Sequence, residues 1–378
     1  MMSDFDSRNR HFDRLANTAG LKWLGQNTNH LPPHPAVLDA MRHVIETAEF
    51  QAYAPPAGYE ELRELIRADL GLPDASVWVT DGAISGLYHV CHTLLRPGDE
   101  IIAADPGWKW PLEFARAQGA GIVEVPIYGA DCGYTLAPEA LERAITPSTR
   151  LVYFVDPNNP LGSCASAETI REVCDLARAA GAFILHDCTY RHFADRHTLA
   201  YNYYPEGTVL TYSFSKWLGL AGLRVGALVA HPALMERLAA SPPNNLGSSV
   251  IAQRAAIAGL KIKAEWFPQV QRVQRANQAA IHAAVAGIPG LSIPVYPSQA
   301  NFLAVDVAGA GIRPEALVAA AAAEGILIRA GAYHTRRFAE RFVKCSTTVP
   351  TEWVEEFCQR LPQLVERARL DVTTHDVF

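Results

Sequence analysis

The sequence predicts an α/β protein: a large domain with a mostly parallel seven-stranded sheet sandwiched by helices, plus a smaller α+β domain. Three observations predict this class. Short apolar runs alternate with longer helical patterns between about residues 75 and 230, polar residues follow several of these runs directly, and the pattern changes after about residue 245. At roughly 150 residues per domain, a chain of 378 residues suits two unequal domains around a cleft.

The large sheet is predicted from runs that are apolar almost throughout. Such strands are buried on both faces, which is typical of a parallel sheet covered by helices. The runs cover residues 76–80, 100–104, 121–125, 151–155, 182–186, 209–212 and 225–230. A long helical stretch, broken or bent at Pro268, then leads into the second unit. We expect an N-terminal arm and part of the small domain in residues 1–45, the large domain in 46–275, and the small C-terminal domain in 276–378.

Composition excludes several classes of function. The formal charge of −6 comes without basic clusters, so we expect no nucleic-acid partner. No window approaches the ~18 uninterrupted apolar residues of a membrane helix, and the N-terminus has no secretion signal, so a cytoplasmic location is expected. The seven cysteines are scattered without a CxxC pair, which argues against a disulfide framework or a zinc site. We therefore expect no metal, and small-molecule chemistry.

Polar residues gather where the predicted strands end. In open parallel sheets, ligands bind beyond the carboxyl ends of the strands, so one cleft would collect these residues. They are found in residues 81–83, 105–108 and 156–159, at Asp187, and in residues 213–216.

The strongest signal is the segment SFSKWLGLAGLRVG, residues 213–226. A lysine at the end of a buried strand resists burial as an unpaired ammonium ion, and forming an imine removes that cost. A surface lysine before a glycine-rich turn is the alternative. The segment resembles the signature of class I and II aminotransferases, which are pyridoxal 5′-phosphate (PLP) enzymes of fold type I. The resemblance implies that Lys216 forms a Schiff base with PLP and acts as the catalytic base, and that Ser213 and Arg224 bind the cofactor phosphate.

Two further motifs extend the resemblance to the cofactor ring. His186-Asp187-Cys188-Thr189-Tyr190 is similar to the D-x-x-Y segment of the family. It implies that Asp187 pairs with the pyridine nitrogen, which makes the ring an electron sink, and that Tyr190 bonds the phenolic oxygen O3′. Residues 156–162, DPNNPLG, resemble the NPxNPTG loop, with Asn159 also on O3′. Asp156 for Asn and Leu161 for Thr are departures that leave this amide in place.

Three weaker elements fall in the order of the family. Thr80-Asp81-Gly82-Ala83-Ile84 opens a predicted helix, where the N–H groups of Ala83 and Ile84 could hold the phosphate. Trp108 matches an aromatic residue that stacks on the pyridine ring, although a lone Trp is more often core packing. Tyr53 lies in a segment resembling Y-x-x-x-x-G…LR, which implies contact with the phosphate of a neighbouring subunit and hence a homodimer with active sites at its interface.

The resemblance changes where the substrate would bind. The family places an arginine in a Φ-Φ-R-Φ-S context, and this sequence has Phe342-Val343-Lys344-Cys345-Ser346. The surrounding pattern is nearest to the histidinol-phosphate aminotransferase and threonine-phosphate decarboxylase branch. Asn27 matches the position of the N-E-N segment of that branch, and Arg329 matches its G-I-x-V-R strand. Lys344, Arg329 and Asn27 are therefore the candidate substrate-binding residues. A lysine neutralises a carboxylate but lacks the planar fork of arginine.

The function that the resemblance implies is transfer of an amino group from an α-amino acid to a keto acid, with Lys216 moving the proton. Decarboxylation, elimination, cyclisation or oxidation of an amino acid on the same fold is the main alternative. A non-catalytic PLP-binding sensor is a third hypothesis, which the intact set of Lys216, Asp187, Tyr190 and Asn159 disfavours.

Overall fold

The computed structural model describes residues 4–371. Residues 1–3 and 372–378, which belong to the expected N-terminal arm and C-terminal domain, lie outside the described part. Two compact units divide the chain. The small unit comprises residues 1–30, 273–297 and 302–378, and the large unit comprises residues 31–272 and 298–301. The expected domain boundaries, after residues 45 and 275, stay a prediction, because a compact unit need not fold independently.

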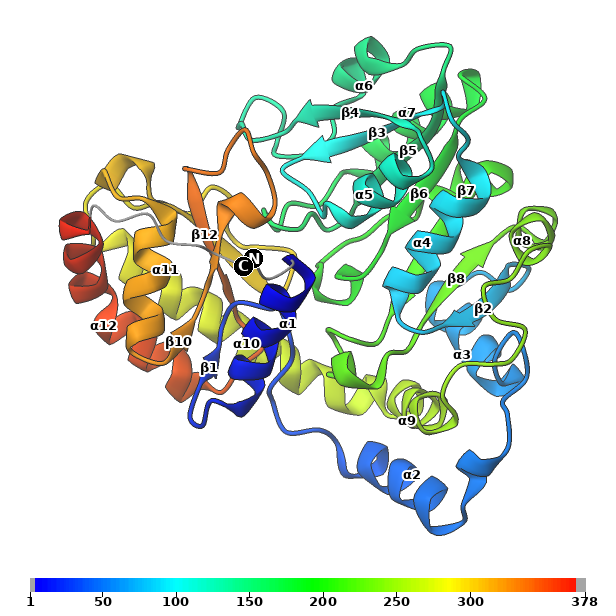
Figure 1. The fold of residues 1–378 in the computed structure, drawn as a ribbon, viewed down its shortest axis with the longest axis horizontal. Coiled ribbons are helices and arrows are strands. Elements are labelled where there is room, and N and C mark those ends of the chain that lie inside the picture. Colours follow the sequence, from blue (N-terminus) through cyan, green and yellow to red (C-terminus); the bar gives the residue numbers. More distant parts are fainter. Residues whose placement is uncertain (1–3, 372–378) are drawn as a thin grey trace. The chain divides into compact units, whose positions relative to one another are not determined.

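The large unit contains the seven-stranded sheet, ordered β2-β8-β7-β6-β5-β3-β4 (Figure 1). Strand β8 is antiparallel to both of its neighbours, β2 and β7, whereas the remaining pairs are parallel. The mostly parallel sheet of the predicted fold class is therefore confirmed. Its strands are β2 (Ser76–Thr80), β3 (Glu100–Asp105), β4 (Gly121–Pro126), β5 (Thr149–Val155), β6 (Phe183–Asp187), β7 (Thr208–Ser213) and β8 (Gly226–Ala230).

Helices surround this sheet: α4 packs on β7 and β8, and α7 on β6. The N-terminus of α7 is capped by Ser166, whose side chain accepts the N–H of Thr169, and α3 ends at Gly71 in the left-handed conformation. The helices of the large unit are α2 (Pro35–Glu46), α3 (Glu60–Leu70), α4 (Ala83–Leu94), α5 (Trp110–Ala117), α6 (Pro138–Ala144), α7 (Ala167–Ala179), α8 (Pro232–Ala239), α9 (Val250–Lys261) and the start of α10 (Lys263–Ala286).

The long helical stretch is interrupted at Ile262, between α9 and α10, and continues through Pro268. The expected break at Pro268 is wrong, because the helix is interrupted six residues earlier and continues through the proline, whereas a bend at Pro268 stays a prediction. Ile262 caps α9, and its carbonyl accepts the first backbone bonds of α10, from Glu265 and Trp266. Because α10 restarts at Lys263, Pro268 lies early in the new helix.

The small unit has its own core, which includes Leu303, Leu317 and Phe357. Its antiparallel sheet is ordered β11-β12-β9, and β1 pairs with β10 in parallel. The run expected as one strand near residues 325–329 is thus divided between two sheets. The elements are α1 (Asp4–Asn17), β1 (Lys22–Trp23), the rest of α10, β9 (Phe302–Asp306), α11 (Pro314–Ala323), β10 (Ile326–Leu327), β11 (Arg329–Ala330), β12 (Phe342–Ser346) and α12 (Thr351–Leu370). Within residues 4–371, no helix combines the length and the apolar character of a membrane span.

Candidate active site

Most of the predicted cofactor residues of the large unit lie at or just beyond the carboxyl ends of β2, β3, β5, β6 and β7, whereas Arg224 precedes β8 and Tyr53 lies before α3. Asp187 is the last residue of β6, where it is in register with Val155 of β5 and Thr211 of β7. The loop after β5 is tied to this point, because the backbone N–H of Asp156 donates to the carbonyl of Asp187 at 3.1 Å. The fold therefore brings the loop carrying Asn159, the carboxylate of Asp187 and the end of β7 to one end of the sheet.

Asp187 is a buried carboxylate with one oxygen fully engaged. Its Oδ1 atom accepts the Thr189 N–H at 3.1 Å, the Thr189 hydroxyl at 2.6 Å and the Thr211 hydroxyl at 2.7 Å. Its Oδ2 atom accepts no hydrogen bond from residues 4–371. The carboxylate is thus held in a fixed orientation with one oxygen left for a donor outside the protein.

The electrostatics of Asp187 favour a cationic partner at that oxygen. Burial raises the pKa of Asp187, and the hydrogen bonds from Thr189 and Thr211, together with the charge of Lys216, act in the opposite direction without cancelling it. A buried carboxylate is costly unless it is paired. A positively charged N–H donor would therefore stabilise the ionised form.

Lys216 is held on a loop anchored by two buried rings. Phe214 and Trp217 are fully buried, and their ring centroids lie 6.0 Å apart. The loop is closed by the Ser215 N–H, which donates to the Ser213 hydroxyl at 3.3 Å. Lys216 itself is half-buried, and its charge acts on Asp187. The packing thus positions an amine near the carboxylate while leaving it partly accessible.

The start of β8 draws three segments together. Gly226 is in register with Thr80 of β2 on one side and with Ser213 of β7 on the other. A Cβ atom at Gly226 would lie 2.5 Å from the backbone nitrogen of Ala83, so only glycine permits this approach. The N-terminus of α4 therefore packs directly against the start of β8, which pairs with the end of β7.

Arg224 adds guanidinium hydrogen-bond donors to the backbone N–H groups at the N-terminus of α4. A Cβ atom at Gly82 would lie 2.2 Å from its Nη2 atom, so the guanidinium lies against the residue that precedes α4. The backbone N–H groups of Ala83 and Ile84 donate to no acceptor within the described range 4–371, and the first turn of α4 carries no acidic residue. Helix amides and a guanidinium together suit an anion such as a phosphate.

The other predicted cofactor residues occupy loops of the large unit. Asn159 and Tyr190 are buried, and the charges of Asp187 and Tyr190 both act on the hydroxyl of Tyr153. Trp108 is partly buried between β3 and α5. Tyr53, in contrast, is 80% exposed. The roles of these residues toward a cofactor stay predictions.

Sequence reasoning missed Thr189, Thr211 and Tyr153. The two threonines orient Asp187, as described above. Tyr153 lies on β5 with its hydroxyl buried and without a hydrogen-bond partner in the described chain, and burial raises its pKa. A signal was present for Thr211, because it precedes Ser213 by two residues and side chains two apart share one face of a strand. Tyr153 within an apolar run gave no comparable signal.

The candidate substrate residues are all in the small unit. Arg329 of β11 and Lys344 of β12 are directly in register, so their side chains lie on the same face of the sheet. Both are buried. Asn27 is also buried, and its backbone N–H donates to the hydroxyl of Ser346, two residues beyond Lys344, at 2.8 Å. The structure therefore groups these three residues.

Aromatic rings support the two cations. The Arg329 guanidinium lies 4.5 Å from the centroid of the Tyr333 ring, and the Lys344 ammonium lies 5.0 Å from that of Phe302. Burial lowers the pKa of Arg329, although an arginine remains charged in proteins. Two buried cationic side chains on one face of a sheet are of a chemical type that suits an anionic ligand.

The fold and this arrangement define the class of α/β proteins with an aspartate-aminotransferase-like fold. The N-succinyldiaminopimelate aminotransferase of Mycobacterium tuberculosis superimposes with a TM-score of 0.85 at 23% identity, covering 96% of this chain and 100% of that chain. The aspartate aminotransferase of Thermus thermophilus gives a TM-score of 0.83 at 23% identity, covering 96% of this chain and 97% of that one. These similarities establish the fold.

Sequence comparison identifies the family. The model of "Aminotransferase class I and II" matches residues 20–361. The chain is 29% identical over 327 residues to the histidinol-phosphate aminotransferase of Methanosarcina mazei, covering 85% of this chain and 83% of the relative. The chain belongs to the aminotransferase class I and II family, and its general reaction is the transfer of an amino group. The resemblance stated from the sequence motifs is thereby confirmed.

Proposed function

We propose that the chain is a PLP-dependent aminotransferase that takes the amino group of an anionic α-amino acid or a related amine and passes it to a keto acid. One observation supports this most directly. A half-buried lysine, a buried carboxylate with one open oxygen, and a helix N-terminus with open amides lie where β7, β6 and β2 end. PLP carries an aldehyde, a protonated ring nitrogen and a phosphate, which are the groups that these three features suit.

The residues present fit this cofactor. Lys216 would hold it covalently through Nζ, and Asp187 would accept the ring N–H at Oδ2 and keep the ring nitrogen protonated. When bound, PLP supplies an electron sink for the charge that develops at the substrate α-carbon. The other contacts follow the family pattern: Tyr190 and Asn159 at O3′, Trp108 against the ring, and Ser213, Arg224, Ala83 and Ile84 around the phosphate.

The chemical step would be a proton transfer by Lys216. With its Nζ atom free of the cofactor, Lys216 would remove the proton from the substrate α-carbon and hold it for the return transfer. Hydrolysis by one water would release the keto acid, and the amino group would pass to a second keto acid. The ionised Asp187, oriented by its threonine donors, would hold the ring N–H and keep the electron sink protonated.

The substrate would carry an anionic group, which Arg329 and Lys344 bind, with Asn27 nearby. This proposal is supported by two buried cations side by side on one face of a sheet. The relatives named histidinol-phosphate aminotransferase and aspartate aminotransferase each take their names from a substrate with an anionic group.

The cytoplasmic location expected from the sequence also stays a prediction.

Conversion of the cofactor tests the reaction. The purified protein is incubated with single amino donors that differ in their anionic group, and the bound cofactor is identified by chromatography. Transamination converts PLP to pyridoxamine phosphate, whereas persistent PLP with release of ammonia, carbon dioxide or peroxide would establish the alternative reaction. A Lys216→Ala protein that retained full activity would contradict the whole proposal.

The proposed homodimer can be tested through Tyr53. An exposed tyrosine is available to reach the phosphate site of a second copy. Lys216→Ala and Tyr53→Ala chains, each of low activity alone, are mixed and allowed to exchange subunits. If Tyr53 acts on the neighbouring subunit, mixed dimers contain one intact site and regain activity. A mixture no more active than its components would refute this arrangement.

A further inference from the structure

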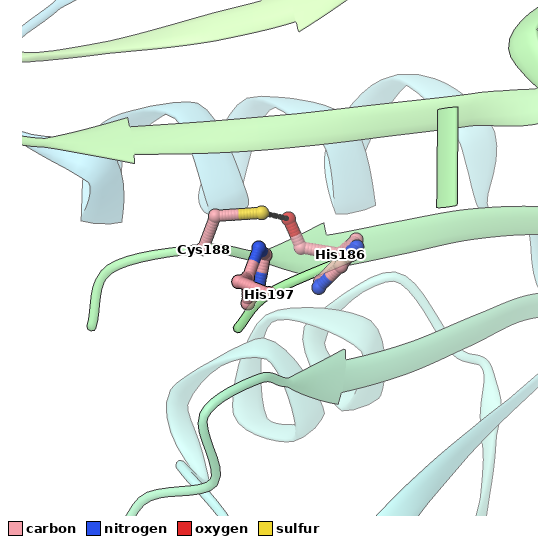
Figure 2. Close-up of side chains that lie close together, drawn as sticks. All are labelled: His186, Cys188 and His197. Atoms are coloured by element: carbon pink, nitrogen blue, oxygen red, sulfur yellow. Dashed lines mark hydrogen bonds between the residues drawn. The ribbon is translucent and has the colours of Figure 1, made fainter. Parts of the chain in front are cut away.

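A compact group of metal-ligating side chains lies around the C-terminal end of β6 and does not include the residues proposed to contact the cofactor. His186, Cys188 and His197 each offer one ligand atom, and these atoms lie within 4.8 Å of one another (Figure 2). His186 and Cys188 are buried, and the side chain of His197 is only 6% exposed. We propose that His186, Cys188 and His197 form a binding site for a single zinc-like transition metal ion, which they hold through two imidazoles and a thiolate.

Two nitrogen atoms of this group lack hydrogen-bond partners among the described residues. Nε2 of His186 and Nδ1 of His197 are buried and have no hydrogen-bond partner in the described chain. The Cys188 thiol makes one weak contact, to the carbonyl of His186 at 3.6 Å. Buried polar atoms without partners are rare in folded proteins. Two such atoms, on the imidazoles of a group that also contains a thiol, favour a bound metal ion.

Asp156 orients the imidazole of His197. Its Nε2 atom lies 2.9 Å from the carbonyl of Asp156 and 3.3 Å from the carboxylate of the same residue. These acceptors bind the Nε2–H group, so a metal would be bound through Nδ1, with release of any proton that this atom carries. A histidine oriented by a carboxylate in this way is the usual arrangement around protein-bound metals. Orientation of a metal-binding histidine would explain why this chain has Asp156 where the family motif has asparagine.

Geometry and chemistry select the metal class. Zinc bonds of about 2.0–2.1 Å to nitrogen and about 2.3 Å to sulfur place tetrahedral ligands roughly 3.3–3.8 Å apart. The three atoms therefore need to approach one another by on the order of 1 Å, within reach of small side-chain rotations. A thiolate with imidazoles suits Zn²⁺ or Co²⁺ and disfavours Mg²⁺ or Ca²⁺, which prefer oxygen.

Binding would require one local adjustment. The N–H of Ala200 donates to Nδ1 of His186 at 3.3 Å, so a metal on Nε2 moves the imidazole proton to Nδ1 and ends this bond. The loss of one long hydrogen bond is small compared with the gain from metal ligation. The cysteine spacing argues against a zinc site, because the ligands have no CxxC pair and His197 reaches the group only through the loop that follows β6.

The site is tested on the full-length chain, independently of the proposed reaction. After exposure to zinc chloride and dialysis, metal content by mass spectrometry should approach one equivalent per chain. Titration against a chromophoric chelator then gives the affinity, which Cys188→Ser and His197→Gln should abolish. Asp156→Asn should weaken it by about 10–100-fold, the usual effect of removing a group that orients a ligand. Cys91→Ala, which removes a buried thiol outside the group, should bind zinc normally.

The change in unfolding temperature provides a second measurement if a variant folds poorly. Zinc should raise the Tm of the unmodified chain and of Cys91→Ala but not that of Cys188→Ser. Cobalt bound by the unmodified chain should show the visible bands of a tetrahedral thiolate site. Less than about a tenth of an equivalent of zinc on the unmodified chain, or equal binding by the Cys188→Ser variant, overturns the proposal.

Discussion

Replacement of Thr211 by valine isolates one of the donors that orient Asp187. Thr211 is fully buried, and its hydroxyl lies 2.7 Å from Oδ1 of Asp187. Valine keeps the shape of the side chain but removes the donor, while both donors of Thr189 remain. The substitution therefore changes the electrostatics of the carboxylate with little change in packing.

The magnitude follows from the charge of the acceptor. A hydrogen bond to an ionised group contributes about 1.5–3 kcal/mol, and each 1.4 kcal/mol corresponds to about a factor of ten. PLP affinity and kcat/KM should therefore fall by about 10–100-fold in Thr211→Val. Because the lost bond favoured the ionised form, the pKa of Asp187 rises further above its usual range. The defect should accordingly grow as the pH falls and shrink as the pH rises.

The assay is a PLP titration, followed by absorbance, at several pH values. Thr211→Ser retains the hydroxyl and serves as the control, with an affinity within about threefold of the unmodified chain. If valine and serine have the same effect, or if the valine defect does not vary with pH, the hydroxyl does not act through the charge of Asp187 and the reasoning fails.

Three further predictions concern other parts of the chain. Gly82→Ala should weaken PLP binding at least about tenfold, because its Cβ would collide with Arg224. Gly71→Ala is the control: it is also at positive φ, but no atom lies within 4 Å of its Cβ, so it should lower only the stability. PLP titration measures the first effect and thermal unfolding the second. Asp69→Asn should destabilise the chain by about 3–5 kcal/mol at neutral pH, measured by denaturant unfolding. Burial opposes ionisation of Asp69, but the hydrogen bond from His192 and the nearby cations hold its pKa below the usual range, so this difference should diminish as the pH falls below about 4. Lys344→Met should raise KM for the anionic substrate about tenfold or more, and Lys344→Arg should stay within a few-fold; equal KM values for both would remove Lys344 from the substrate site.

The sheet of the large unit was predictable because each strand is locally distinct. Seven apolar runs of four to six residues, separated by helical patterns, gave all seven strands to within one or two residues. The order β2-β8-β7-β6-β5-β3-β4 was not predictable by this route, since register and neighbour depend on contacts far apart in sequence. The same limit applies in the small unit, where residues 326–330 divide between two partners.

In the candidate site, residues that stand in sequence motifs could be predicted, whereas contacts that depend on tertiary structure could not. Lys216, Asp187 and Arg224 stand in motifs, so the sequence could name them. Thr211 could not be named as a partner of Asp187, because the contact depends on the register of β6 against β7. Likewise, the adjacency of Arg329 and Lys344 follows from the register of β11 and β12 and not from their separation along the chain.

Asp156 illustrates why a departure from a motif needs the structure to be interpreted. Compared with the asparagine of the family, it adds a negative charge to a fully buried loop, which is unfavourable unless that charge is paired. Burial alone would raise the pKa of Asp156, yet the hydrogen bond and charge of His197 lower it, and its Oδ1 atom also accepts the N–H of Ala165 at 2.8 Å. The compensating histidine lies 41 residues along the chain. If Asp156 and His197 act as a pair, replacing both should cost less stability than the sum of the two single replacements, and a double-mutant cycle measured by denaturant unfolding decides this. Strictly additive losses would mean that the loop tolerates the charge for another reason.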